Sequence, residues 1–323
     1  MTARDGLKEA AAVLAESEKI ALACHVGPDG DALGSMLGFG IAASNAGKTV
    51  VASFGAPFAV PDNLSFLPSD LLINPSKFPD TPGTMVVFDA GSPDRLGELA
   101  ANAKEAGTLV VLDHHVTNVG FGDIAVIDPT AAATGELVVD LLEILAWPIT
   151  PDIANCLHTA LVTDTGRFLY ANTSPRTLEY AAKLVAAGAS PEEIGRHVYD
   201  EAPFGYLHAA GAALARAELD PELGVVSTIL TYKDLAAAGI DWGDVDNLMN
   251  TVRLAKEADV AVIAKLHADG RVKVSLRSRG LTDVGSLAAE FGGGGHRLAS
   301  GFNFDGDPEK AIESVLERVE ANR

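Results

Sequence analysis

The chain has 323 residues, 48% of them hydrophobic and 21% charged, which is enough for two ordinary globular domains and excludes a disordered chain, a collagen or a coiled coil. Its formal net charge of −20 argues against a protein that binds long DNA or RNA, because such proteins need clustered Lys and Arg. Two cysteines, Cys24 and Cys156, are too few for a disulfide framework and favour a reducing compartment. The sequence shows neither a signal-peptide pattern nor an apolar run of ~20 residues, so we expect a soluble, cytoplasmic protein.

In the first part of the chain, short apolar runs alternate with Ala- and Leu-rich stretches of helical spacing. We expect strands at 19–25, 48–54, 84–89, 108–113 and 124–127, and helices near 6–18, 32–46, 94–106, 133–146, 151–163 and 174–187. This βαβ alternation predicts an α/β fold with a mostly parallel, doubly wound sheet. We assign residues 1–188 to this first domain.

The pattern changes around residues 189–205, where we place a linker. Ser190, Pro191 and Glu193 form a helix start, and the sequence APFG at 202–205 interrupts that short helix. A smaller α/β domain is expected over 206–323. Its predicted elements are helices at 206–217, 284–291 and from 308, and strands at 224–230, 260–267, 272–277 and 299–304. We expect the active site in the cleft between the two domains.

Carboxylates and histidines follow several of the strands predicted for the first domain. The carboxyl ends of parallel strands meet at one edge of a sheet, where ligands bind, so these side chains are expected to converge. The turn after the first strand and the end of a helix add further carboxylates. The candidates are His25, Asp29, Asp31, Asp89, Asp113, His114, His115 and Asp164.

This set of ligands contains nitrogen and oxygen atoms and no thiolate, which suits Mn(II), Mg(II) or related ions. Six ligands with shared carboxylates are enough for two metals, and two divalent ions would nearly cancel the acidic charge. Paired metals recur in enzymes that hydrolyse phosphoesters. Taken singly, the DGD at 29–31 is a common helix start and a carboxylate after a strand often caps the next helix. The conjunction of all the motifs favours a metal site.

The motifs resemble those of a known family. HVGPDGDALGS (25–35), VVFDAG (86–91), LDHHVTN (112–118) and LVTDTGRF (161–168) resemble the four motifs of the DHH phosphoesterase superfamily. SLRSRG (275–280) and FGGGGHRLASG (291–301) resemble the DHH-associated C-terminal domain. The resemblance covers essentially the whole chain. It is strongest to the short two-domain nanoRNases, which also remove the 3′-phosphate of phosphoadenosine phosphate or cleave linear dinucleotides.

The resemblance implies a role for each candidate residue. It implies two divalent ions, with Mn(II) preferred and Mg(II) as the alternative, and it makes Asp89 the bridging ligand. Asp113 would stand beside a metal-bound imidazole and fix its orientation. His115 would face the scissile phosphate, either holding a non-bridging oxygen or protonating the leaving oxygen. The implied metal ligands are His25, Asp29, Asp31, Asp89, His114 and Asp164.

The second domain is expected to bind the substrate. Glycines allow backbone N–H groups to approach a phosphate closely, although four glycines can also form a flexible linker. A local excess of cations runs from Lys265 to Arg279 and is either a solvated strand face or a partial substrate contact. Asn250 and Arg253 either reach the substrate from a helix or belong to an exposed helical face. The residues that the resemblance assigns to substrate binding are Arg277, Ser278, Gly293, Gly294, Gly295 and His296.

The resemblance implies hydrolysis of very short RNA and linear dinucleotides such as pApA to mononucleotides, with 3′-phosphatase activity on phosphoadenosine phosphate. It also implies a homodimer and no long nucleic acid or membrane as a partner. Three alternatives stay open: a cyclic di-AMP phosphodiesterase, a manganese inorganic pyrophosphatase, and a nucleotide-binding regulator without turnover. The GGGGH sequence at 292–296 disfavours the pyrophosphatase, and the complete set of metal positions disfavours the regulator.

Overall fold

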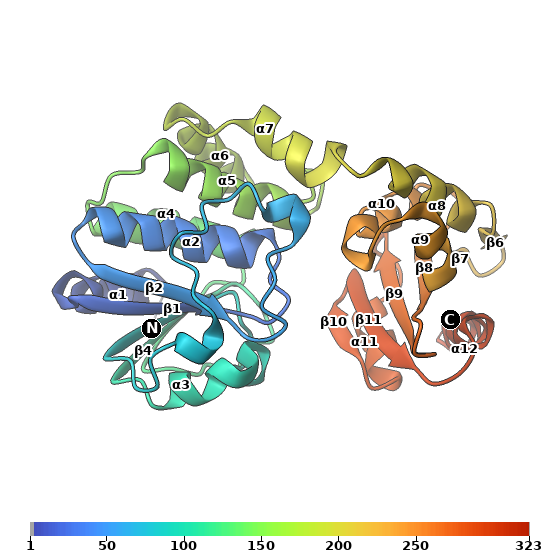
Figure 1. Cartoon of the computed structure of the whole chain (residues 1–323), viewed down its shortest axis with the longest axis horizontal. Helices are drawn as coiled ribbons and strands as arrows, with labels where there is room; N and C mark the ends of the chain where they lie inside the picture. Colours follow the sequence, from blue (N-terminus) through green and yellow to red (C-terminus); the bar gives the residue numbers. More distant parts are fainter. Residues whose placement is uncertain (1–2, 323) are drawn as a thin grey trace. The chain divides into compact units, whose positions relative to one another are not determined.

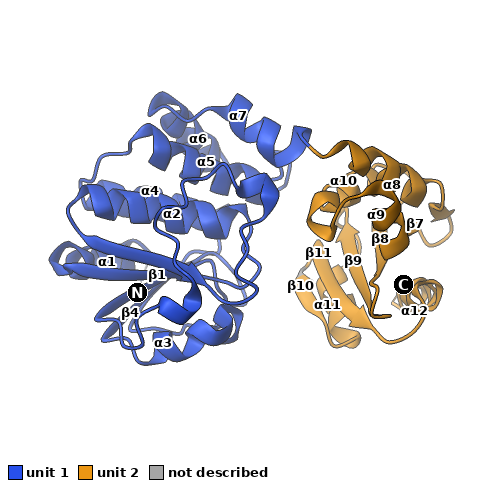
Figure 2. Ribbon diagram, in the orientation of Figure 1, with its two compact units in different colours: residues 1–201 blue, residues 202–323 orange. Residues whose placement is uncertain are grey.

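The computed structural model describes residues 3–322, apart from the side chain of His296, and the chain divides into two compact units, residues 1–201 and 202–323 (Figure 2). Residues 189–201, which the sequence analysis assigned to a linker, belong to the first unit. They contain the short helix α7 (Pro191–Gly195). The Ser190 side chain caps this helix by accepting a hydrogen bond from the Glu193 N–H. Within residues 3–322, no helix is long and apolar enough to cross a membrane.

The first unit is built around a five-stranded sheet in the order β2-β1-β3-β4-β5, with every pair of neighbours parallel (Figure 1). Its strands are β1 (Lys19–Cys24), β2 (Thr49–Phe54), β3 (Thr84–Phe88), β4 (Thr108–Asp113) and β5 (Ile124–Ile127). Its other helices are α1 (Ala3–Glu16), α2 (Gly30–Asn45), α3 (Ala100–Lys104), α4 (Thr134–Ile144), α5 (Pro151–Asp164) and α6 (Pro175–Ala186). The predicted α/β class with a parallel sheet is confirmed.

Both faces of this sheet are buried, which explains why its strands are apolar along their whole length. In β1, Ile20 and Leu22 pack into the larger core with α1, α2, α4 and α5. Ala21 and Ala23, which alternate with them, pack on the opposite face against Leu96, Leu99 and their neighbours.

The helix expected at 94–106 is wrong in its first half. Residues Pro93–Leu99 form 3₁₀ turns, and α3 begins only at Ala100. The break lies at Gly97, whose φ of 60° and ψ of −131° are not helical. This turn also supports the loop after β1, because the Arg95 carbonyl accepts a hydrogen bond from the Val26 N–H at 2.8 Å.

Helices α2 and α5 pack against each other at very short range. A Cβ atom at Gly34 would lie 2.3 Å from the Cys156 carbonyl oxygen, so only glycine permits this approach. Asp31 lies in the first turn of α2, and Asp164 is the last residue of α5. The contact therefore fixes the two helices that carry these carboxylates.

The second unit contains a six-stranded mixed sheet in the order β10-β11-β9-β8-β7-β6, in which only β7 and β8 are parallel. Its strands are β6 (Glu218–Asp220), β7 (Val225–Thr231), β8 (Val260–Leu266), β9 (Val272–Ser278), β10 (Gly294–His296) and β11 (Ala299–Phe304). Its helices are α8 (Phe204–Leu214), α9 (Tyr232–Ala238), α10 (Leu248–Val252), α11 (Val284–Glu290) and α12 (Pro308–Ala321). The sequence analysis did not predict β6, β10 or α9, whereas α10 lies where both interpretations of Asn250 and Arg253 expected a helix.

Helices cover this sheet on both sides, but not over its whole width. One face packs against α11 and α12 through residues such as Val262 and Val274. On the other face, α8, α9 and α10 cover β7 and β8 through residues such as Val226 and Ile263.

Candidate active site

The candidate metal ligands of the first unit meet at the carboxyl edge of its sheet. His25 follows β1 and Asp89 follows β3, the two strands at which the strand order reverses direction. In open α/β sheets this switch point is where ligands bind. Asp113 ends β4, and the structure brings all of these residues together, as the sequence predicts.

One group of possible ligands consists of His25, Asp29 and Asp89. The His25 Nε2 atom lies 3.8 Å from Asp29 Oδ2 and 3.6 Å from Asp89 Oδ2. One ligand atom from each of the three residues falls within 4.8 Å of the others. These distances can close around a single cation.

A second group consists of Asp31, His114 and Asp164. The His114 Nε2 atom lies 3.7 Å from Asp31 Oδ2 and 3.3 Å from Asp164 Oδ2. It also lies 3.5 Å from Asp89 Oδ1, whereas the other oxygen of Asp89 faces His25. Asp89 therefore directs one oxygen toward each group, which is the arrangement that a bridging carboxylate requires.

Backbone carbonyls orient both imidazoles for metal binding. His25 Nδ1 lies 3.0 Å from the Val26 carbonyl oxygen, and His114 Nδ1 lies 3.3 Å from that of Ala131. Because a carbonyl oxygen can only accept, each Nδ1 carries a hydrogen. Nε2 of each ring therefore faces the carboxylates and is the atom that would coordinate a metal, after giving up any proton that it carries, as in metal-binding histidines generally.

The start of α4 holds two of the buried carboxylates, Asp31 and Asp89. The backbone N–H groups of Thr134 and Gly135 donate to Asp31 at 2.6 and 3.0 Å, and the Thr134 hydroxyl donates to Asp89 at 3.1 Å. Ser35 also donates to Asp31, at 2.9 Å. The sequence analysis missed these contacts, since a Thr-Gly pair at the start of a helix carries no signal of its own.

Asp89 adopts a backbone conformation that few residues tolerate. Its φ is 55°, in the left-handed region where Asp and Asn are favoured among residues other than glycine. Its N–H donates to the Leu112 carbonyl at 3.0 Å, so the residue stays tied to β4. Such strained positions cluster at functional sites.

The cluster has more negative than positive charge. Burial, followed by the charge of Asp89, raises the pKa of Asp31 to about 8. Burial, followed by Asp31, raises the pKa of Asp164 well above its usual range. Burial opposes protonation of His25, but Asp29 and Asp89 outweigh it and raise the pKa of His25 to about 10. A divalent cation would supply the missing positive charge, so the residues present fit a metal.

Asp113 does not stand beside the imidazole that the sequence analysis assigned to it. Its Oδ1 lies 2.7 Å from His115 Nδ1, and its Oδ2 accepts from Asn118 at 2.6 Å. Both oxygens of this fully buried carboxylate thus have a partner, and the imidazole that it contacts is that of His115, not that of the candidate ligand His114. Asn118 lies within the quoted LDHHVTN motif, but its role could not be inferred from the sequence.

The second unit places the candidate substrate residues on and after β9. Arg277 is half-buried, and Ser278 is 7% exposed. The Ser278 hydroxyl accepts from the Gly280 N–H at 3.0 Å and lies 3.4 Å from Asp259. Asp259 in turn accepts from the N–H of Thr282 at 2.8 Å. Ser278 therefore shapes the turn after β9 in addition to any contact with substrate.

The glycine run is a strand edge rather than a free linker. Gly294 and Gly295 pair with Gly301 and Ser300 across β10 and β11. A Cβ atom at Gly293 would lie 2.3 Å from the Gly301 carbonyl oxygen, whereas one at Gly294 would meet nothing within 4 Å. The His296 backbone belongs to β10, but its side chain lies outside the described part of the chain.

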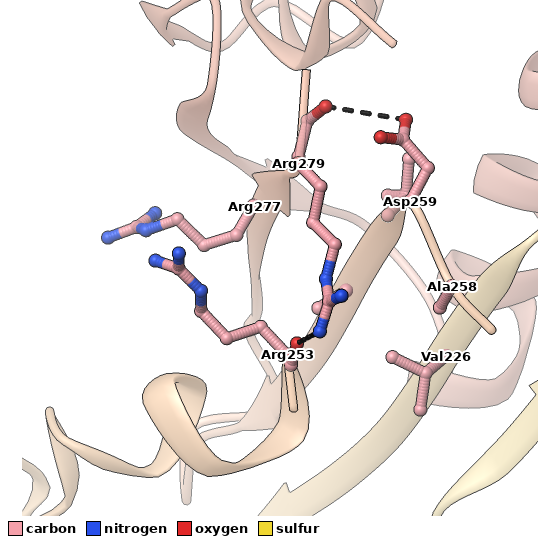
Figure 3. Close-up of a pocket in the computed structure, with 9 residues that line it drawn as sticks. Val226, Arg253, Ala258, Asp259, Arg277 and Arg279 are labelled. Carbon is pink, nitrogen blue, oxygen red and sulfur yellow. Dashed lines mark hydrogen bonds between the residues drawn. The ribbon is translucent and has the colours of Figure 1, made fainter. Parts of the chain in front are cut away.

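Arg253, which the sequence analysis left between two interpretations, lines the same small pocket as Arg277 and Arg279. In Figure 3 the guanidinium groups of Arg253 and Arg277 extend to the same side. Arg279 turns back instead and donates to the Arg253 carbonyl at 2.7 Å. Arg253 thus adds a cation next to Arg277 and Ser278 of the SLRSRG sequence.

Comparison with known proteins identifies the family. The DHH family N-terminal domain matches residues 19–161, and the DHHA1 domain matches residues 225–322. The bifunctional oligoribonuclease and PAP phosphatase NrnA of Thermus thermophilus is 34% identical over 302 residues, covering 93% of this chain and 89% of the relative. The protein of the same name from Bacillus subtilis is 27% identical over 289 residues, covering 88% of each. The chain belongs to the DHH phosphoesterase family, as its motifs predict.

Solved structures share the fold. An exopolyphosphatase-related protein from Bacteroides fragilis has a TM-score of 0.89 at 26% identity, over 97% of this chain and 96% of that chain. RecJ from Thermus thermophilus, solved in complex with Mn²⁺, has a TM-score of 0.54 at 17% identity, over 98% of this chain and 54% of RecJ. The likeness to RecJ is one of fold alone.

Proposed function

We propose that this protein hydrolyses very short RNA and linear dinucleotides to mononucleotides and removes the 3′-phosphate of phosphoadenosine phosphate. The observation that carries the proposal is the pair of ligand groups that share Asp89, in a chain whose relatives are named oligoribonuclease and PAP phosphatase. Paired groups of this kind recur in enzymes that cleave phosphoesters.

Two divalent cations are the cofactors of this proposal. His25, Asp29 and Asp89 would hold one ion, and Asp31, His114, Asp164 and Asp89 would hold the other. When bound, such ions neutralise charge on the phosphoryl oxygens and lower the pKa of the attacking water. Mn(II) is the preferred ion, since two imidazoles accompany the carboxylates, and Mg(II) is the alternative.

His115 is the residue that we assign to the scissile phosphate. Asp113 occupies its Nδ1 side at 2.7 Å, which directs Nε2 away from that carboxylate. Nε2 would then donate a hydrogen bond to a phosphate oxygen or a proton to the leaving oxygen. In the second unit, Arg277 would bind a nucleotide phosphate, with Arg253 next to it in the same pocket.

A substrate panel tests the proposal directly. The purified protein is incubated with Mn(II) and either phosphoadenosine phosphate, linear diadenylate, cyclic diadenylate, pyrophosphate, or RNA of graded length, and products are resolved by chromatography. We expect rapid loss of the linear dinucleotide and phosphoadenosine phosphate, with long RNA and pyrophosphate untouched. Preferential release of phosphate from pyrophosphate would overturn the proposal, and absence of turnover with every substrate would favour a binding regulator.

Asp89→Asn tests the metal assignment within that panel. Asn tolerates the left-handed backbone of residue 89, so the fold should persist while the bridging negative charge is lost. We expect turnover to fall by more than about 100-fold. Circular dichroism and thermal unfolding provide the control for folding. Retention of more than a few per cent of the activity would contradict the assignment of Asp89 as the bridge.

We further propose a homodimer, because the family resemblance implies one. Light scattering of the purified chain should give twice the mass of 33.4 kDa. A mass equal to one chain at micromolar concentration would contradict it.

A further inference from the structure

Among residues 3–322, α8, α9 and α10 cover β7 and β8 on one face of the second sheet, and no helix packs on the same face of β9, β11 and β10 (Figure 1). Side chains alternate along β9, so Val274 and Leu276 enter the core with α11 and α12 while Lys273, Ser275 and Arg277 lie on the opposite face. Lys273 is exposed, and Ser275 and Arg277 are half-buried. We call this the open face of β9, β11 and β10.

The middle of the open face is lined by small residues. Strand pairing places Gly301 of β11 beside Ser275, and Gly294 of β10 beside Gly301. Directly opposed residues of antiparallel strands lie on the same face. None of these three has a side chain larger than a hydroxymethyl group, so the backbone is accessible to a flat group such as a nucleoside.

Cations lie at both ends of this floor. Arg277 lies at one end, and Lys273 lies four residues away on β9, which is about 13 Å along a strand. Across the pair β8–β9, Lys265 lies directly opposite Lys273. Two ammonium groups in directly opposed positions of neighbouring strands repel one another, yet the strand pairing places Lys265 and Lys273 in such positions.

Lys265 is the more informative of the two lysines. Its side chain is 16% exposed, and its Nζ lies 3.8 Å from Asp246 Oδ1, a long ion pair with a carboxylate that is itself 67% exposed. Burial lowers the pKa of Lys265. Asp246 also interacts electrostatically with Lys273 and Arg277, so one exposed carboxylate faces three cations. The positive charge that it leaves uncompensated would be stabilised by an anion that binds between the two lysines.

The other cations of this segment have different partners. Arg271 belongs to the turn and donates to Asp269 at 2.6 Å, and Arg279 donates to the Arg253 carbonyl. Neither belongs to β9. Lys273 and Arg277 are therefore the cations of the segment 265–279 that lie on the open face, and Lys265 lies beside Lys273 at the edge of that face, on the neighbouring strand β8.

We propose that Lys265 and Lys273 form a second phosphate subsite, which binds the phosphate one nucleoside away from the phosphate held by Arg277. The subsite rests on the proposed function and refines its specificity. It would favour substrates with two phosphates flanking a nucleoside, such as a 3′,5′-bisphosphate or a dinucleotide with a 5′-phosphate, over analogues with one.

Equilibrium binding without metal tests the subsite independently of hydrolysis. Titration calorimetry in the presence of a chelator compares adenosine 3′,5′-bisphosphate with adenosine 3′-monophosphate. The variants are Lys273→Gln and Lys265→Met, the latter keeping the apolar stem of the half-buried side chain. Arg271→Gln is the matched control, because it removes the same charge from a neighbouring position off the open face.

Each subsite variant should bind the bisphosphate about fivefold more weakly and the monophosphate unchanged within twofold. The control should bind both like the wild type. Equal weakening of both nucleotides, or an equal effect of Arg271→Gln, would overturn the subsite, because either result indicates a general electrostatic field. Unchanged binding in both subsite variants would also overturn it.

A kinetic comparison separates this inference from the proposed function. With Mn(II), kcat/KM is measured for linear diadenylate with and without its 5′-phosphate. The two lysine variants should lose the preference for the 5′-phosphorylated diadenylate. Their kcat/KM for the diadenylate without a 5′-phosphate should equal that of the wild type. If no substrate is hydrolysed while the binding discrimination persists, the proposed function fails and the subsite stands.

Discussion

The two units place charge on their sheets in opposite ways. In the first unit, carboxylates and imidazoles lie at the ends of parallel strands, and Asp31, Asp89 and Asp113 are each no more than 3% exposed. In the second unit, cations lie within antiparallel strands, on a face that stays partly open to solvent. The first arrangement suits groups that must be held in a fixed geometry, and the second suits long side chains that adjust to a polyanion. We expect changes in the first unit to alter kcat and changes in the second to alter KM.

Asp113→Asn is the strongest test of this contrast. His115 and Asn118 meet different oxygens of Asp113, so after replacement of one oxygen by NH₂ one of these two groups would face a donor in place of an acceptor. We expect kcat to fall about 10- to 100-fold, with KM for the linear dinucleotide unchanged within about twofold. A rise in KM with kcat preserved would show that Asp113 acts on substrate binding and would break the contrast.

A smaller effect is expected in the pH dependence of stability. His158 is 4% exposed and contacts Phe168 edge to face. Its buried Nδ1 has no hydrogen-bond partner among the residues that the structure describes. Burial lowers the pKa of His158 below its ordinary value of 6.5. The native state therefore resists a proton that the unfolded state accepts, and stability is lost as pH falls below 6.5 toward the lowered pKa.

Urea unfolding between pH 7 and pH 5 checks this expectation. On acidification, the free energy of unfolding of His158→Gln should fall less than that of the wild type. The difference between the two slopes should be at most about 1.4 kcal/mol per pH unit. His208→Gln, at an exposed position on α8, is the control and should follow the wild type. Identical pH dependence in all three proteins would show that His158 is not a source of acid sensitivity in the first unit.

Much of the first site could be predicted from the sequence, because strand ends of a parallel sheet converge whatever the details of packing. His25, Asp89 and His114 could be placed together from strand order alone. The partner of Asp113 could not, since an aspartate next to two histidines can face either ring. The donors at Thr134 and Gly135 were also missed, because only the packing of α4 brings them to Asp31.

The second unit was harder to predict for a different physical reason. Lys265 and Lys273 were noted as part of a cationic segment, but only the antiparallel register shows that they lie opposite one another and that Arg271 does not join them. Short strands such as β6 and β10 depend on neighbouring strands and carry weak local patterns. Gly97 is a comparable case in the first unit, because its non-helical backbone conformation, which the sequence analysis did not predict, interrupts the helix expected at 94–106.

The absence of a side chain at Gly34 has a consequence for the entropy of the site. Helices α2 and α5 touch backbone to backbone at this point, so Asp31 and Asp164 are carried on main chains whose separation no rotamer change can alter. The two carboxylates repel one another, but the packing of α2 against α5 keeps them close in the folded protein. A cation that arrives between them does not have to draw two mobile segments together. Its binding free energy is therefore not reduced by the cost of ordering the chain, and the site is preorganised by a residue that lies a full helical turn away from it.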